Sequence, residues 1–275
     1  MKQESWPKNH NPSLHMSHSE AEQKLNLIDT HCHIHEADYP LDREAAYQRA
    51  LSTGVSRLVC VGTDAVSSRA AVQFAAQHEH GWASIGLHPH DAREGAAALD
   101  ELRQLAGSPK VIAVGECGLD YFYNNSPKAE QAKMLRAQIE LALEHDKPLI
   151  FHVREAFDDF WPIFDSYSGI RGVLHSFTDN RKNMERAIVS GLYIGVNGIS
   201  TFTKDEAQID MYRSIPLQNL LLETDAPFLT PVPLRGNVNE PAYVMCIAKY
   251  ISDLKSISLE DLARASTSNA HKLLF

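Results

Sequence analysis

Eight short apolar runs, each followed by an amphipathic stretch of helical length, constrain the fold of this chain more than any other feature. The runs are rich in Val, Ile and Leu and recur from residue 25 onward. Apolar runs that alternate with helices predict parallel strands joined by helical crossovers. The predicted strands are 25–32, 56–62, 82–89, 110–118, 147–154, 172–177, 192–198 and 219–227.

The amphipathic stretches predict helices over 42–53, 67–79, 96–106, 128–146, 155–167, 180–190, 204–214, 240–254 and 258–274. Eight strand–helix units in 275 residues favour one α/β domain, a TIM (β/α)8 barrel with an extra C-terminal helix. A doubly wound open sheet is the alternative, but the sequence has no GxGxxG or GxxxxGK(S/T) turn to support nucleotide binding on it. We expect the barrel to span residues 25–275.

Residues 1–24 are polar, contain two prolines and lack an apolar signal-peptide core, so we expect a flexible leader there. No apolar run reaches the roughly 18 residues that a membrane helix requires. The four cysteines are scattered without a CxxC pair, and a core of this size needs no disulfides. These features predict a reduced, cytoplasmic protein.

The charge balance limits the partners that the chain can have. Lys and Arg number 26 against 35 Asp and Glu, which gives a net charge of −9. A protein that coats duplex DNA usually carries a basic surface. We therefore expect no extended nucleic-acid footprint, although a pocket that recognises one phosphate at a strand end remains compatible with this charge.

Histidines and carboxylates recur where the predicted strands end. In a barrel these positions share one edge, the edge at which barrel enzymes place their active sites. The residues are His31, His33, His88, His90, Glu116, His152, His175, Glu223 and Asp225. Their regular placement indicates a site rather than scattered surface histidines.

The spacing of His31 and His33 puts both imidazoles on one face of a strand, because strand side chains alternate. Imidazoles combined with carboxylates suit divalent Mg, Mn or Zn. Six such ligands exceed what one catalytic zinc needs, so two metal ions per chain are expected, with Glu116 as the bridging carboxylate. A hydroxide that bridges two ions would hydrolyse a phosphoester, an amide or an ester.

The sequence resembles the TatD family of metal-dependent hydrolases, within the amidohydrolase-like barrels. The resemblance covers residues 25–275, and its motifs occur in family order. They are the segments 28–33 (IDTHCH), 86–90 (GLHPH), 115–121 (GECGLDY), 152–156 (HVREA), 175–177 (HSF), 223–227 (ETDAP) and 235–241 (RGNVNEP).

The resemblance implies a role for each ligand and an activity. His31, His33 and Asp225 would hold one metal. His152 and His175 would hold the second, and Glu116 would bridge the two ions. Members of the family are described as metal-dependent deoxyribonucleases, often 3′-to-5′ exonucleases.

Three positions depart from the family pattern without removing a ligand. His35 stands where the family usually has an acidic residue, and Cys117 where an aliphatic residue is common. Val238 stands where a lysine or arginine usually precedes the asparagine of the arginine–glycine segment. The change at Val238 bears on phosphate binding rather than on the chemistry.

Two carboxylates are candidates for the general base. We expect Asp225 both to ligate metal and to take the proton from the attacking water, the alternative being a helix N-cap. Glu223 shares a strand face with Asp225. It either orients a metal ligand or serves as the base itself.

Four residues are candidate substrate contacts. Arg154 and Arg235 offer guanidinium groups that suit a phosphate. His90 and Tyr121 are placed to line the cleft. The alternatives are an ion pair for Arg154, a structural loop role for His90 and simple packing for Tyr121.

We therefore expect a dinuclear hydrolase of phosphodiester bonds that trims DNA from an end. The alternative enzyme uses the same metals on a small-molecule amide, lactone or ester, including an aminoacyl ester, and the net charge of −9 favours it mildly. A non-enzymatic metal-storing or partner-binding barrel would require fully occupied coordination, which six ligands for two ions do not provide.

Overall fold

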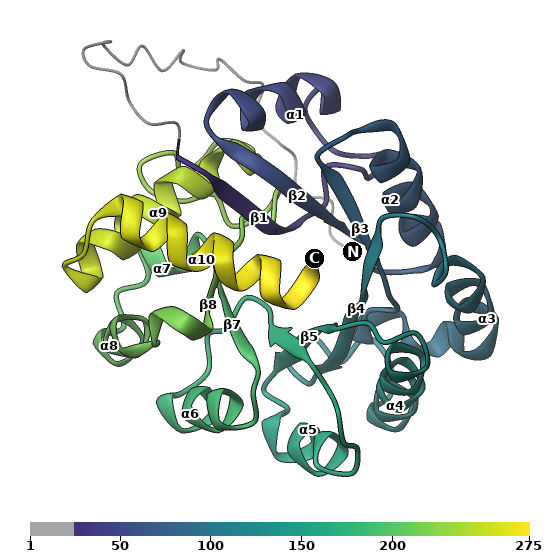
Figure 1. Ribbon diagram of the computed structural model, residues 1–275. Helices are drawn as coiled ribbons and strands as arrows, with labels where there is room; N and C mark the ends of the chain where they lie inside the picture. Colours follow the sequence, from purple (N-terminus) through teal and green to yellow (C-terminus); the bar gives the residue numbers. More distant parts are fainter. Residues whose placement is uncertain (1–24) are drawn as a thin grey trace.

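The computed structural model describes residues 25–275, which form one sheet of eight strands in sequence order (Figure 1). Every neighbouring pair of strands is parallel. The strands are Leu27–Cys32 (β1), Val55–Val61 (β2), Gly81–Ile85 (β3), Val111–Asp120 (β4), Leu149–Arg154 (β5), Gly172–Leu174 (β6), Tyr193–Val196 (β7) and Leu220–Leu222 (β8).

The sheet closes where β1 meets the segment that follows β8. Cys32 and Ala226 form a parallel bridge. The N–H of Asp225 donates to the carbonyl of His31 at 2.8 Å, and the N–H of His33 donates to that of Ala226 at 2.7 Å. The prediction of a TIM barrel is confirmed, and the contacts that close it involve three predicted site residues, His31, His33 and Asp225.

Helices surround the barrel on the outside (Figure 1). They are Arg43–Ser52 (α1), Ala65–Gln77 (α2), Gly95–Leu105 (α3), Lys128–Glu144 (α4), Phe157–Phe164 (α5), Arg181–Val189 (α6), Ile199–Phe202 (α7), Glu206–Ser214 (α8), Val244–Lys255 (α9) and Leu259–Leu274 (α10). Short 3₁₀ turns cover Pro89–Glu94 (η1), Leu217–Asn219 (η2) and Pro241–Tyr243 (η3). The sequence did not predict α7, and it started α9 too early because η3 precedes that helix.

Several helices begin at a side chain that accepts a backbone hydrogen bond from the first turn. Such caps satisfy amide groups that have no partner within the helix, and losing one costs about 1 kcal/mol. The capping residues are Asp42, Asp64, Asn180, Asp205 and Ser258.

The extra C-terminal helix closes the amino end of the barrel. Figure 1 shows α10 lying across the barrel. Ala270, Leu273 and Leu274 pack there in one cluster with interior strand residues. The strand residues of this cluster are Ile28, Val59, Val61, Ala113, Ile150, Val173 and Leu221. Because this end is filled, the carboxyl end of the strands is the one left for a site.

The cysteines are all free, and Cys32, Cys60 and Cys117 are buried. Within residues 25–275, no helix has the length and apolarity needed to cross a membrane. The leader predicted over 1–24 lies outside the described residues.

Candidate metal centre

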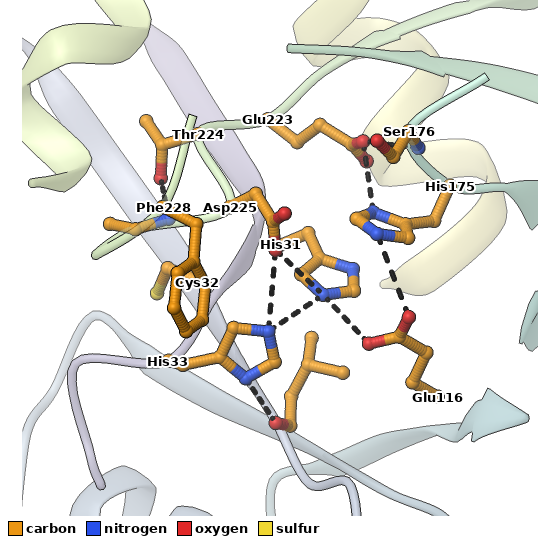
Figure 2. A network of polar contacts seen from close by, with 12 residues as sticks. His31, Cys32, His33, Glu116, His175, Ser176, Glu223, Thr224, Asp225 and Phe228 are labelled. Atoms are coloured by element: carbon orange, nitrogen blue, oxygen red, sulfur yellow. Dashed lines mark hydrogen bonds and ion pairs between the residues drawn. The ribbon is translucent and has the colours of Figure 1, made fainter. Parts of the chain in front are cut away.

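The six predicted metal ligands come from different strands and meet at the carboxyl end of the barrel, and Figure 2 shows five of them. They are His31 and His33 at the end of β1, Glu116 in β4, His152 in β5, His175 directly after β6, and Asp225 after β8. Three groups of donor atoms lie close enough to hold a metal ion: His31–His175–Asp225, His31–His33–Glu116 and, with His88 added to the predicted ligands, His88–Glu116–His152.

His31 and His33 face each other and share one carboxylate. Their Nε2 atoms lie 3.1 Å apart and are 3.6 Å and 3.4 Å from Oδ1 of Asp225. The Nδ1 of His33 lies 2.9 Å from the carbonyl oxygen of Val61, which orients the ring. Burial opposes a charge on His33, but Asp225 and Glu36 raise its pKa to about 9. This half of the cluster therefore attracts positive charge.

Glu116 lies at the centre of the cluster. Its Oε2 is 3.3 Å from Nε2 of His31, and its Oε1 is 2.8 Å from Nδ1 of His152. Nε2 of His175 and Nε2 of His88 lie 3.6 Å and 3.5 Å from the same Oε1. Burial opposes ionisation of Glu116, but the imidazoles of His175, His88 and His31 hold its pKa well below the usual range.

Glu223 lies behind His175, on the side of the ring away from Glu116 (Figure 2). Its Oε1 is 3.0 Å from Nδ1 of His175 and accepts the N–H of Ser176 at 2.6 Å. A Cβ at Gly195 would meet Oε2 of Glu223 at 2.5 Å, so only glycine leaves room for this carboxylate. Burial opposes a charge on His175, but Glu223 and Glu116 raise its pKa to about 10.

Asp225 is held in a backbone conformation that residues other than glycine rarely adopt. Its φ is 60°, in the left-handed region. Such conformations concentrate at functional sites. Burial opposes ionisation of Asp225, but His33 and His175 lower its pKa, so the carboxylate faces the cluster in its charged form.

Asp120 is a member of the site that the sequence reasoning missed. It is fully buried, and its Oδ2 lies 3.0 Å from Nε2 of His152 and 3.1 Å from Nε2 of His90. Burial opposes ionisation, but hydrogen bonds from His152 and His90 lower its pKa. The available signal was its spacing of four residues from Glu116 in one strand, which predicts a shared face.

His88, which the sequence places at this edge of the barrel without assigning it to a metal, also joins the cluster. Its Nδ1 accepts the N–H of His90 at 3.2 Å, which turns Nε2 toward Glu116. Burial and the neighbouring His152 lower the pKa of His88 to about 4. The ring is therefore a neutral donor beside the carboxylate.

The predicted substrate contacts differ in where they lie. The guanidinium of Arg154 sits 4.0 Å from the ring centre of Phe122, on the segment beside the cluster. The guanidinium of Arg235 sits 4.0 Å from the Phe202 ring centre. Tyr121 is not brought to the cluster.

The Tyr121 side chain turns outward instead. Its hydroxyl donates to Asp159 at 2.7 Å, and the Lys128 ammonium lies over its ring. The positions that depart from the family pattern are all buried: Val238, Cys117 and His35, whose Nε2 lies 3.1 Å from Oγ of Ser67.

A parallel barrel with imidazoles and carboxylates gathered at the carboxyl ends of its strands has the architecture of a metal-dependent hydrolase. Comparison with known proteins agrees. The family model described as TatD related DNase matches residues 28–275. The chain belongs to this family, so the predicted class, a metal-dependent hydrolase, is confirmed.

Individual relatives cover almost the whole barrel. The chain is 36% identical over 250 residues to the "Uncharacterized metal-dependent hydrolase YabD" of Bacillus subtilis, covering 90% of this chain and 98% of that protein. It is 34% identical over 256 residues to the "3′-5′ ssDNA/RNA exonuclease TatD" of Erwinia tasmaniensis, covering 90% of this chain and 99% of that protein. The crystal structure of YjjV, a TatD homologue from Escherichia coli, superposes with a TM-score of 0.84 at 30% identity. The match covers 90% of this chain and 97% of that chain.

Proposed function

We propose that this chain is a two-metal deoxyribonuclease that removes nucleotides from the 3′ end of a single strand. The observation that carries the proposal is the composition of the cluster. Among the described residues, the ion-pair partners of Glu116 and Asp225 are all imidazoles. A buried set of imidazoles and carboxylates fits Mg, Mn or Zn. The relative named as a 3′-5′ exonuclease supports the substrate.

We assign His31, His33 and Asp225 to one ion, His152 and His175 to the other, and Glu116 to both. When bound, two divalent cations would supply Lewis acidity that lowers the pKa of water and neutralises charge on the phosphate. The four unpaired cysteines support a reducing compartment such as the cytoplasm.

Within the reaction, Asp225 is the general base. Attack of water on phosphorus forms one P–O bond and breaks the P–O3′ bond to the shortened strand. Asp225 accepts a proton of the water, and the departing 3′ oxygen is protonated from solvent. Glu223 holds His175 from behind and is a positioning residue. His90, Arg154 and Arg235 remain the proposed contacts to the substrate.

The test uses purified protein, 3′-labelled single-stranded DNA and Mg²⁺ or Mn²⁺. The wild type should release labelled nucleotides, and Asp225→Ala should lose about 10²- to 10⁴-fold in rate. Equal release by both proteins would show that the activity does not come from this cluster.

A metal-dependent hydrolase of a small amide, lactone or ester is the second candidate, favoured by the net charge of −9. It predicts turnover of an ester panel without release of nucleotides from DNA.

A further inference from the structure

Exposed aromatic side chains follow two strands that face each other across the barrel mouth. Phe122 and Tyr123 come directly after β4 and are 51% and 54% exposed. Phe228 comes after β8 and is 48% exposed. In a closed barrel with strands in sequence order, β4 and β8 are diametrically opposed. The proposed metal ligands therefore lie between the two aromatic surfaces.

The first aromatic surface is fixed to the cluster through Asp120. Oδ1 of this carboxylate accepts the N–H groups of Phe122 and Tyr123 at 3.0 Å and 2.9 Å. Its Oδ2 faces the imidazoles of His90 and His152. One buried side chain thus sets the position of the aromatic pair relative to the proposed ligand His152.

A planar cation already lies against this pair. The Arg154 guanidinium is 4.0 Å from the Phe122 ring centre and 4.9 Å from the Tyr123 ring centre. The two rings are perpendicular and still keep about half of their surface open with Arg154 in place. The pair and Arg154, called the β4 ledge below, combine two exposed aromatic rings with one positive charge.

The second surface also lies beside a proposed ligand. The ring centres of Phe228 and His33 are 6.3 Å apart, and Figure 2 shows Phe228 beside His33. The Phe228 N–H donates to the carbonyl of Asp225 at 2.8 Å, and its own carbonyl accepts from Asn239 at 2.5 Å. The backbone of Phe228 is therefore anchored beside the proposed base.

We propose that the β4 ledge and Phe228 stack the nucleobases on the two sides of the scissile phosphate of a single strand. The proposal rests on the proposed function and names how that substrate is held. Base–aromatic stacking needs no basic surface, which suits a chain with a net charge of −9. The bases of a duplex are already stacked and paired, so these surfaces would select single strands.

The kinetic test combines variants with substrates that lack one base. Phe122→Ala/Tyr123→Ala and Phe228→Ala are compared with the wild type on oligonucleotides that are intact or abasic at the last or the penultimate position. Phe275→Ala is the matched control, an exposed aromatic whose ring packs against Trp82 at the start of β3. Each site variant should raise KM about 10- to 100-fold on the intact strand. This rise in KM should disappear on the strand that lacks the base stacked on the substituted side chain.

Two kinetic results would overturn the proposal. One is a KM unchanged on the intact strand. The other is an equal rise in KM on intact and abasic strands, because such a rise would come from a structural defect rather than from lost stacking. A Phe122→Trp variant adds a positive check and should bind the intact strand as well as the wild type.

A binding measurement separates this proposal from the proposed function. The anisotropy of a 5′-fluorescein single strand is measured with chelated protein, so that no turnover is needed. Weaker binding by the two site variants supports the stacking surfaces even if the wild type cleaves no DNA. Equal binding by all variants, or no binding by the wild type, overturns them.

Discussion

Oε1 of Glu223 lies 3.0 Å from Nδ1 of His175, while Nε2 of the same ring faces Glu116 at 3.6 Å. The carboxylate thus fixes which nitrogen His175 presents to the cluster. Partners behind a ligating imidazole fix its orientation and raise its basicity. Glu223 therefore belongs to the site through His175, whereas Asp225 borders the cluster directly.

Glu223→Gln should weaken metal binding about 10- to 100-fold, because the amide keeps the shape but removes the charge behind His175. Isothermal titration with Mn²⁺ measures the affinity, and Glu185→Gln on the exposed face of α6 serves as the control. An affinity equal to that of the wild type would remove Glu223 from the site.

Asp120→Asn and Asp120→Ala should separate the two roles of this residue. Asn can still accept the N–H groups of Phe122 and Tyr123, but it loses the charge that faces His152. We expect Asn to lower activity with little loss of stability. Ala should also cost about 1–3 kcal/mol of folding free energy, because two amide groups lose their partner. Urea unfolding and DNA hydrolysis measure the two effects, and equal stability of all three proteins would contradict this division.

Metal-free protein should lose stability as the pH rises above neutrality. The folded pKa values of His33 and His175 are raised to about 9 and about 10, against 6.5 for the free group. A raised folded pKa gives stability that is fully present below pH 6.5 and is lost as the pH rises through 9 and 10. Thermal unfolding of chelated protein from pH 6 to 10 checks the direction, and a Tm that rises across this range would contradict it.

The same protons should be released when metal binds, because an imidazole must be neutral to coordinate. The apparent affinity for Mn²⁺ should therefore rise between pH 7 and pH 9. Titrations in buffers of different ionisation enthalpy count the released protons. A count of zero at pH 7 would mean that His33 and His175 are already neutral there.

Leu273→Ala should destabilise the fold by about 2–5 kcal/mol, because it leaves a cavity where α10 fills the amino end of the barrel. The site lies at the other end, so activity per folded molecule should stay unchanged. Val189→Ala, at an 88% exposed position of α6, is the control and should shift stability by less than about 0.5 kcal/mol. Similar unfolding midpoints for the two variants would contradict the role of α10.

The barrel could be predicted because its strands read as apolar runs and its helices as amphipathic stretches. The gathering of His31, Glu116 and Asp225 also followed from the sequence, since the carboxyl ends of parallel strands share one edge. The short helix α7 could not be predicted, because its four residues, Ile199–Phe202, are too few to show a helical period.

The position of Tyr121 shows where the sequence reasoning was incomplete. It follows Asp120, and alternation along β4 turns Asp120 inward and Tyr121 outward toward Asp159. The same alternation puts Arg154 on the face of His152, beside the mouth. The alternation of side chains along a strand would therefore have been enough to separate Tyr121 from Arg154. In contrast, the packing of Glu223 behind His175 depends on Gly195 in a neighbouring strand, which no local sequence pattern reveals.

The most direct test of the central claim is a Mn²⁺ titration of chelated protein in which metal content and release of nucleotides from single-stranded DNA are measured together. The account predicts no activity without metal, full activity near two ions per chain, and no recovery in Glu116→Gln. Full hydrolysis by chelated protein, or normal metal uptake and activity in Glu116→Gln, would contradict it.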